Sequence, residues 1–191
     1  MTEVPSVRTQ RLLLRAWRSS DRESFARMNA DPQVMQHFPK LFSAAESNAA
    51  VDRIEEHWRQ RGYGLWAVER LDTGEFIGFL GLATASFEAA FTPAVEVGWR
   101  LAAAHWGQGF ATEGGRAALD FAFSRLGLAE VVSFTAVSNV KSVAVMQRLG
   151  LAHEPSLDFE HPAVPVGHPA RPHVLYRISR QRWLDAAASR A

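Results

Sequence analysis

The feature that most constrains the fold is the glycine-rich turn HWGQGFATEG, which begins at His105 and joins a strand-like segment to a helix-like one. The preceding segment, AVEVGWRL, alternates as a strand does, and Thr112 to Leu126 carries apolar residues at helical spacing. The following segment, EVVSFTAV, is rich in β-branched residues and predicts a buried strand. A strand, a helix and a strand this close together predict a βαβ unit in which the two strands lie parallel.

The rest of the chain predicts an antiparallel meander with helices beside it. Strand patterns occupy RLLLRAW, LWAVER, FIGFLGLA and HVLYRIS. Two pairs of residues have the spacing of a capping box and predict a helix start, namely Ser20 with Glu23 and Ser43 with Glu46. Further helical patterns cover residues 142–149 and 180–190. Because there is no repeat and no linker, the whole chain, residues 1–191, is predicted to form one α+β domain.

Composition limits the classes of function. The chain has no cysteine, which excludes disulfides, a thiolate nucleophile and Cys-ligated metal sites, and suits a reducing compartment. The formal net charge of +1 argues against a general electrostatic grip on nucleic acid. The N-terminal stretch MTEVPSVRTQRLLLRAW has no long apolar core, so we expect no signal peptide, no membrane span and a cytoplasmic location.

The glycine-rich turn has the character of a phosphate-binding site. Gly107, Gly109 and Ala111 are small enough to let successive backbone N–H groups converge at the start of the next helix, where the helix dipole favours an anion. A tight strand-to-helix turn also needs glycine when it binds nothing, and this alternative stays open. A Rossmann site is disfavoured because Glu130 begins the following strand, where that site wants an acidic residue at the strand's end. A P-loop is disfavoured because no GK[ST] follows.

Two stretches carry a resemblance to a known family: VEVGWRLAAAHWGQGFATEGGRAALDFAF and AEVVSFTAVSNVKSVAVMQRLGL. They resemble the acetyl-CoA-binding half of the GNAT superfamily of N-acetyltransferases, and more narrowly the branch that includes the RimJ and RimL ribosomal-protein alanine acetyltransferases. The resemblance is strong over residues 95–151 and extends to the rest of the chain. It implies a mixed, mostly antiparallel central sheet with a splayed parallel strand pair and helices on both faces.

The resemblance also implies a reaction. It predicts transfer of an acetyl group from acetyl-CoA to a primary amine, either a protein N-terminus or a small-molecule amine, by direct attack in a ternary complex. The absence of cysteine agrees with this route, because no thiol is present to carry the acetyl group. The implied protein is a monomer or homodimer that uses no metal, nucleic acid or membrane. The alternative is an acyl-CoA-binding module of the same fold that acts as a sensor or partner without turnover.

The resemblance assigns the coenzyme to particular residues. The pantetheine arm would pair with the splayed strand at Val97, Trp99, Arg100 and Leu101, and the pyrophosphate would lie on Gly107, Gln108, Gly109, Phe110, Ala111 and Thr112. Gly98 would mark a bulge in the splayed strand. Asn139 would bond the pantetheine arm or cap the next helix, and Ser142 would cap that helix or face the thiol. Trp106 stands where the superfamily has Gln or Arg, a departure common in the RimJ/RimL-like branch.

Two catalytic roles concern the coenzyme: one group must stabilise the thioester oxygen, and another must protonate the departing thiolate. A backbone N–H near Val97 to Trp99 is predicted to hold the thioester oxygen as negative charge develops on it. Many enzymes of the superfamily protonate the thiolate with a tyrosine, but Met146 occupies that place here and has no proton to donate. The branch implies Ser142 as the proton donor instead.

The general base has several candidates. Glu96 on the splayed strand is one, acting directly or through water, and Glu160 in the stretch LDFEH is another. Asp158 and His161 lie in the same stretch and stay open as alternatives. The alternation of Glu96 with its valine neighbours also allows it to be an ordinary solvent-facing strand residue.

The acceptor side is predicted from a proline-rich loop, DFEHPAVPVGHPARPH. Its Asp158, His161 and Arg171 are expected to close over the acceptor, and Trp17 and Trp66 to lie on the acceptor side. The histidines of this region fit no common metal-ligand spacing, so no metal site is predicted.

Overall fold

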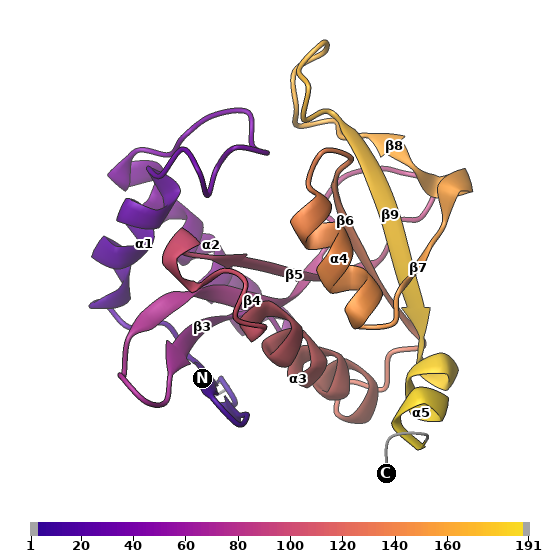
Figure 1. Ribbon diagram of the computed structural model, residues 1–191, viewed down its shortest axis with the longest axis horizontal. Helices are drawn as coiled ribbons and strands as arrows, with labels where there is room; N and C mark the ends of the chain where they lie inside the picture. The colour runs from indigo at the N-terminus through magenta and orange to yellow at the C-terminus, as the bar shows by residue number, and fades with distance from the viewer. Residues whose placement is uncertain (1–3, 189–191) are drawn as a thin grey trace.

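The computed structural model describes residues 4–188, which form a mixed sheet flanked by helices (Figure 1). The sheet has the strand order β1-β2-β3-β4-β5-β6-β9-β7, and β8 pairs with β9. The strands are β1 (Val7–Arg8), β2 (Leu12–Arg15), β3 (Leu65–Arg70), β4 (Phe76–Thr84), β5 (Val95–Leu101), β6 (Glu130–Ala136), β7 (Ala152–His153), β8 (Phe159–Glu160) and β9 (Pro172–Ser179). The helices are α1 (Asp21–Asn29), α2 (Ala44–Arg61), α3 (Phe110–Ser124), α4 (Val140–Arg148) and α5 (Arg180–Ala188), with short 3-10 helices at Ala103–His105 and Pro155–Leu157.

Helices cover both faces of the sheet. α3 packs on β4 and β5, and α4 lies beside it over β6, while α1 and α2 pack together on the opposite face (Figure 1). Leu119 and Phe123 of α3 belong to one apolar core with the sheet. Phe25 of α1 and Val51 of α2 belong to a second core, which includes Ala67 of β3. The predicted α+β class, with a mostly antiparallel sheet between helical layers, is confirmed.

β5 and β6 form the only parallel pair among the strands of residues 4–188, and the two strands separate almost at once. Their register holds a single partner pair, Glu96 with Val132. The other pairings in this part of the chain are antiparallel. Figure 1 shows the two strands diverging behind α4. The splayed pair that the family resemblance implies is therefore present.

Helix caps show where local sequence decides the structure and where packing does. Ser43 and Glu46 form the predicted capping box of α2, and Gly62 ends that helix in the left-handed region with φ of 72°. The predicted capping box of Ser20 with Glu23 is wrong, because Ser20 is itself helical and its side chain makes no cap bond. Asp21, the first residue of the helix, accepts a hydrogen bond from the Arg18 N–H, which precedes the helix, at 2.8 Å.

The predicted bulge at Gly98 is also wrong. β4 and β5 pair in unbroken register from Gly78 with Leu101 to Thr84 with Val95. Gly98 provides space instead, since a Cβ there would lie 3.3 Å from Oε1 of Glu96. The carboxylate of Glu96 therefore leans along the strand over a position without a side chain.

The predicted helix boundaries are close to the observed ones. α3 begins two residues before Thr112, because the turn that precedes it ends at Gly109. α5 ends at Ala188, so the last two residues of the helix predicted over 180–190 lie outside the described residues. Within residues 4–188, no helix combines the length and the apolar character needed to cross a bilayer.

α3 approaches the sheet closely because two glycines face inward. A Cβ on Gly114 would lie 2.1 Å from Cδ2 of Leu80, and one on Gly115 would lie 2.8 Å from Cδ1 of Leu149. Both positions are buried. These two glycines of the ATEGG stretch therefore serve helix packing, which brings the glycine-rich turn up against β4 and β5.

We expect Gly114→Ala to lower the free energy of unfolding by about 1–3 kcal/mol, the usual cost of overpacking a filled core. Denaturant unfolding measures the change. Arg116→Ala, on the exposed side of the same helix, serves as the control and should change stability by no more than about 0.5 kcal/mol. Equal stabilities for the two variants would contradict the close approach of α3 to Leu80.

Candidate active site

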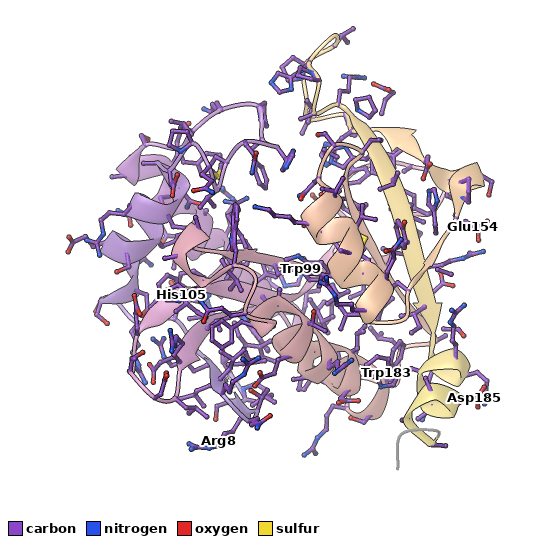
Figure 2. All side chains as sticks on the ribbon, in the orientation of Figure 1. Arg8, Trp99, His105, Glu154, Trp183 and Asp185 are labelled. Carbon is purple, nitrogen blue, oxygen red and sulfur yellow. The ribbon has the colours of Figure 1, made fainter. Side chains whose placement is uncertain are left out.

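The candidate site is built on β5 at the point where it parts from β6. Successive side chains of a strand point to opposite faces. Val97 and Leu101 are buried in the core beneath α3, and Trp99 packs against that core where β5 runs beside α4 (Figure 2). Glu96 and Arg100 lie on the other face, which α1 and α2 cover. β5 therefore presents apolar side chains on one face and two ionisable side chains on the other.

The glycine-rich turn closes one end of the splayed pair. Gly107 and Gly109 have φ of 74° and 82°, in the left-handed region that favours glycine. The first backbone hydrogen bond of α3 joins the Glu113 N–H to the Gly109 carbonyl at 2.9 Å. The N–H groups of residues 110–112 therefore have no acceptor inside the helix, and the positive end of the helix dipole lies with them. This arrangement suits an anion.

Arg11 braces this turn from the first strands of the sheet. Its Nη1 donates to the carbonyl of Gln108 at 2.9 Å, and its Nε donates to Oε2 of Glu113 at 2.7 Å. Its guanidinium also lies 4.6 Å from the ring centroid of Phe110, whose side chain is buried. Sequence reasoning missed Arg11, because it precedes Gln108 by 97 residues and no motif links the two.

Trp106 is tied into the same corner. Its Nε1 donates to the carbonyl of Leu101 at 2.8 Å. Nζ of Lys141, in the first turn of α4, lies 4.1 Å from the centroid of the Trp106 ring. The superfamily's cationic or polar residue is absent at position 106, but a lysine from across the splayed pair places a positive charge beside it.

Asn139 and Ser142 lie where β6 gives way to α4. Oδ1 of Asn139 accepts a hydrogen bond from the Ser142 N–H at 3.2 Å, so the predicted helix cap is confirmed. Nδ2 of Asn139 donates to Oγ1 of Thr135 at 2.9 Å. The hydroxyl of Ser142 is half-buried and makes no hydrogen bond within residues 4–188. Met146 lies in the core, 1% exposed.

Glu96 lines a cavity of about 490 Å³ with Phe87, Phe134 and His161. Its carboxyl has no hydrogen bond or ion pair with any described residue. Burial without a partner disfavours the charged form and raises the pKa of Glu96 to about 8. Glu96 is therefore not the solvent-facing strand residue that alternation alone allows. Its carboxyl binds a proton more tightly than an exposed glutamate does. It lies at the single residue pair through which β5 meets β6.

Aromatic rings form one side of this cavity, and its other lining residues apart from Glu96 are small or uncharged. Phe87 lies against Phe134 and Phe159 with ring centroids 5.6 and 5.5 Å apart. The rings of His161 and His173 lie in tilted contact with centroids 4.9 Å apart, and burial lowers the pKa of both imidazoles, with the neighbouring His173 a second cause for His161.

The loop candidates for the base lie apart from this carboxyl. Glu160 is exposed and pairs with Nε of Arg171 at 2.9 Å. Asp158 lies 3.0 Å from Nε2 of His153 and accepts a hydrogen bond from the Leu175 N–H. Among the acidic and histidine candidates of the loop, His161 alone lines the Glu96 cavity.

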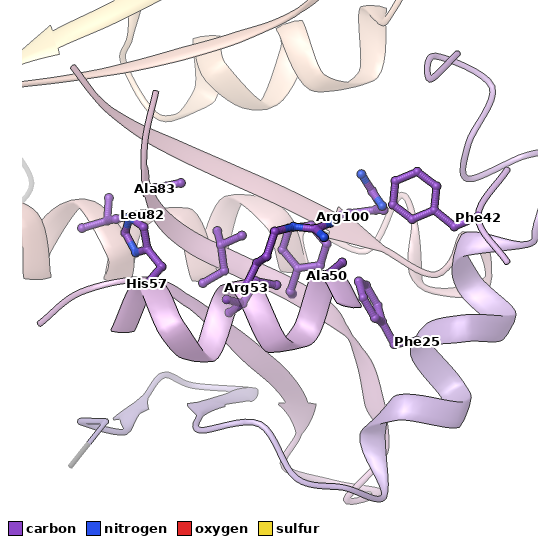
Figure 3. Close-up of a pocket in the computed structure, with 11 residues that line it drawn as sticks. Phe25, Phe42, Ala50, Arg53, His57, Leu82, Ala83 and Arg100 are labelled. Carbon is purple, nitrogen blue, oxygen red and sulfur yellow. The ribbon is translucent and has the colours of Figure 1, made fainter. Parts of the chain in front are cut away.

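A second cavity, of about 260 Å³, lies between the sheet and the helices α1 and α2 (Figure 3). Arg100 reaches into it from β5, while Arg53 and His57 come from α2. Neither tryptophan predicted on the acceptor side lines either cavity. Trp66 has no exposed surface and Trp17 is 9% exposed, so both are core residues, and their place on the acceptor side stays a prediction.

No group of three or more histidine, aspartate or glutamate residues within residues 4–188 has the arrangement of a metal site. His153 lies within hydrogen-bond distance of Asp158, and the ring of His161 contacts that of His173 at a tilt. These histidines therefore have structural partners.

Known proteins are similar to this chain in both sequence and fold. A family model described as an acetyltransferase (GNAT) domain matches residues 11–152. Over 94% of its length the chain is 32% identical to FsC-acetyl coenzyme A-N(2)-transacetylase of Aspergillus fumigatus, covering 78% of that protein. It resembles the crystal structure of an acetyltransferase from Agrobacterium tumefaciens with a TM-score of 0.74 and 28% identity, over 93% of this chain and 96% of that one. Spermidine N-acetyltransferase from Vibrio cholerae, solved with CoA and spermine, shares the fold with a TM-score of 0.71 at 21% identity, over 91% of this chain and 98% of that one.

Proposed function

The chain belongs to the GNAT acetyltransferase family, and on that premise we propose that it transfers the acetyl group of acetyl-CoA to a primary amine by direct attack in a ternary complex. The acceptor is a small-molecule amine or a protein N-terminus. The observation that carries the proposal is the position of Glu96, an unpartnered carboxyl at the single contact between β5 and β6. Trp106, in place of the superfamily's Gln or Arg, supports membership of the RimJ/RimL-like branch.

We assign the coenzyme to the splayed pair and the turn. The backbone of β5 at Val97, Trp99, Arg100 and Leu101 pairs with the pantetheine arm, because β6 leaves that edge without a partner beyond Glu96. The pyrophosphate binds the N–H groups of residues 107–112, which Arg11 braces. Oδ1 of Asn139 already accepts the capping hydrogen bond of α4. A hydrogen bond to the pantetheine arm would therefore use the second N–H of its amide or the second lone pair of Oδ1.

We assign the proton transfers to Glu96 and Ser142. Glu96 takes the proton of the acceptor amine, and its raised pKa makes it a stronger base than an exposed carboxylate once it is ionised. Glu160 is the weaker candidate, since its side chain is exposed, pairs with Nε of Arg171 at 2.9 Å and does not line the cavity that holds Glu96. The hydroxyl of Ser142 donates a proton to the departing thiolate and takes one back from solvent, while Glu96 releases the proton of the amine to solvent. The nitrogen–carbon bond thus forms as the carbon–sulfur bond breaks, and free CoA leaves with its thiol restored.

The test of the function is amine-dependent release of CoA thiol. Purified protein is given acetyl-CoA and a panel of primary amines that includes amino acids, polyamines and peptides with free N-termini. We expect thiol release with at least one amine, matched mole for mole by its N-acetyl derivative. Tight binding of acetyl-CoA without turnover on any amine would support the non-catalytic acyl-CoA-binding module instead.

Lys141→Met is expected to weaken coenzyme A binding about 3- to 10-fold, because it removes the cation beside Trp106 that faces the phosphate turn. Titration calorimetry at two salt concentrations measures the effect, which should shrink as salt screens the exposed charge. Arg148→Met, at the far end of the same helix, is the matched control. An unchanged dissociation constant for Lys141→Met would remove Lys141 from the coenzyme site.

A further inference from the structure

Arg100 is a half-buried cation whose hydrogen bonding is incomplete. Its Nη1 donates to Oδ1 of Asn29 at 2.7 Å, but its Nε is buried without any hydrogen-bond partner. Its guanidinium lies 4.1 Å from the ring centroid of Phe38, and no carboxylate within residues 4–188 pairs with it. Taking a charge out of water without a counter-charge is costly, so an anionic group that pairs with Arg100 would bind favourably here.

The cavity around Arg100 carries positive charge and apolar walls. None of the described residues that line it is acidic, and Phe25, Phe42 and Ile54 are among its walls. Arg53, on α2, has no hydrogen bond or ion pair within the described residues and adds a second cation. The cavity therefore suits an anion attached to an apolar body and opposes a second cation.

His57 contributes a neutral ring to the same wall. Its Nε2 accepts a hydrogen bond from the Thr84 N–H at 3.2 Å, and its Nδ1 lies 2.9 Å from the carbonyl of Tyr63. This pairing requires the proton on Nδ1, and burial lowers the pKa of His57. The positive charge of the cavity thus comes from its two arginines.

Arg100 and Glu96 lie on one face of β5, with Gly98 between them. Four residues of strand separate their Cα atoms by about 13 Å. Glu96 leans over Gly98, and Ala83, the partner of Glu96 across the sheet, lines the Arg100 cavity. An extended molecule along this face reaches Glu96 with one end and Arg100 with the other.

We propose that the Arg100 cavity binds a carboxylate of the acceptor, which makes the preferred acceptor an amine that carries a remote carboxylate on an apolar chain. This inference rests on the proposed acetyl transfer and deepens it by naming the acceptor class. The free Nη2 edge of the guanidinium donates to the carboxylate, while the amine at the other end meets Glu96. A polyamine, with a cation at both ends, is the class that the arginines disfavour.

Three acceptors of equal length test the proposal: 8-aminooctanoate, 8-aminooctanamide and 1,8-diaminooctane. We expect kcat/KM for the acid to exceed that for the amide by roughly 10- to 100-fold, the worth of a charge-assisted hydrogen bond, with the diamine lowest. In Arg100→Gln the ratio of acid to amide should fall toward one, while in Arg100→Lys part of it should remain. Arg59→Gln, an exposed arginine of α2 paired with Glu56, is the control and should keep the wild-type ratio.

A binding measurement separates the carboxylate site from the proposed acetyl transfer. Calorimetry on the wild-type protein saturated with CoA compares the binding of octanoate with that of octanamide. This measurement requires neither turnover nor a folded variant. Stronger binding of octanoate supports the carboxylate site even if no amine is acetylated, in which case the proposed function fails alone. Equal binding of the two probes, or a preference for the diamine or the amide as acceptor, would overturn the inference while leaving acetyl transfer intact.

Discussion

Glu96→Gln is expected to lower kcat/KM for acetyl transfer about 10²- to 10⁴-fold, the usual contribution of a positioned general base. Glutamine keeps the shape of the side chain but cannot accept the amine proton. In the wild type, kcat/KM corrected for neutral amine should rise with pH and level off above about 8, because burial raises the pKa of Glu96 to about 8 and only the ionised form is a base. The variant should lack this ionisation. Steady-state rates across pH measure both effects.

Glu160→Gln is the matched control for the base. Its carboxylate is exposed and paired with Arg171, so we expect kcat/KM within a few-fold of the wild type and an unchanged pH profile. The reverse result, a large loss in Glu160→Gln and none in Glu96→Gln, would transfer the base to the proline-rich loop.

The pH dependence of stability tests the burial of the Glu96 carboxyl independently of catalysis. The folded-state pKa of Glu96 lies above the unfolded value, so folding is favoured while the carboxyl is protonated and loses that advantage as pH rises from about 4.3 through about 8. Glu96→Gln has no such ionisation. The variant should therefore gain stability relative to the wild type across this pH window, and a constant difference would contradict the burial of an unpaired carboxyl.

Gly107→Val is expected to weaken coenzyme A binding about tenfold or more. Gly107 has φ of 74°, a region that costs an L-residue about 1–2 kcal/mol and a β-branched one more. Valine therefore drives the turn toward another conformation and moves the N–H groups that we assign to the pyrophosphate. Calorimetric titration with CoA measures the loss.

Gly127→Val controls for backbone strain alone. Gly127 has φ of 66°, and an added Cβ there, as at Gly107, meets nothing within 4 Å. It lies beyond the other end of α3, so we expect a similar loss of stability but wild-type affinity for CoA. Equal losses of affinity in the two variants would show that the effect is general destabilisation rather than a damaged phosphate turn.

The sequence predicted the fold where local patterns and packing agree. The capping box of Ser43, the strands of the meander and the strand after α3 follow from patterns that tertiary contacts reinforce. Ser20 does not cap the helix because its own backbone is helical, and the next residue, Asp21, is held by two hydrogen bonds from the buried Arg15. A one-dimensional pattern cannot register that contact.

The candidate site was predicted on its coenzyme side and only partly on its acceptor side. The glycine-rich turn and the splayed strand are contiguous motifs, so their spacing is visible in the sequence. Arg11 and the side chain of Arg100 act through contacts with Gln108 and Asn29 that span 97 and 71 residues. Arg100 was predicted to serve through its backbone, and nothing local indicates that its side chain lies in an apolar cavity without a counter-charge.

Single-turnover transfer from acetyl-CoA labelled in the acetyl group tests the central claim most directly. Protein in excess over labelled acetyl-CoA is mixed with the best acceptor amine, quenched in acid at intervals, and separated into protein, amine and coenzyme. The account predicts that label passes from acetyl-CoA to the amine at the rate at which CoA thiol appears, with none on the protein and none moved when the amine is omitted. Label on the protein before the amine is added, or release of acetate with no acetylated amine, would contradict direct transfer in a ternary complex.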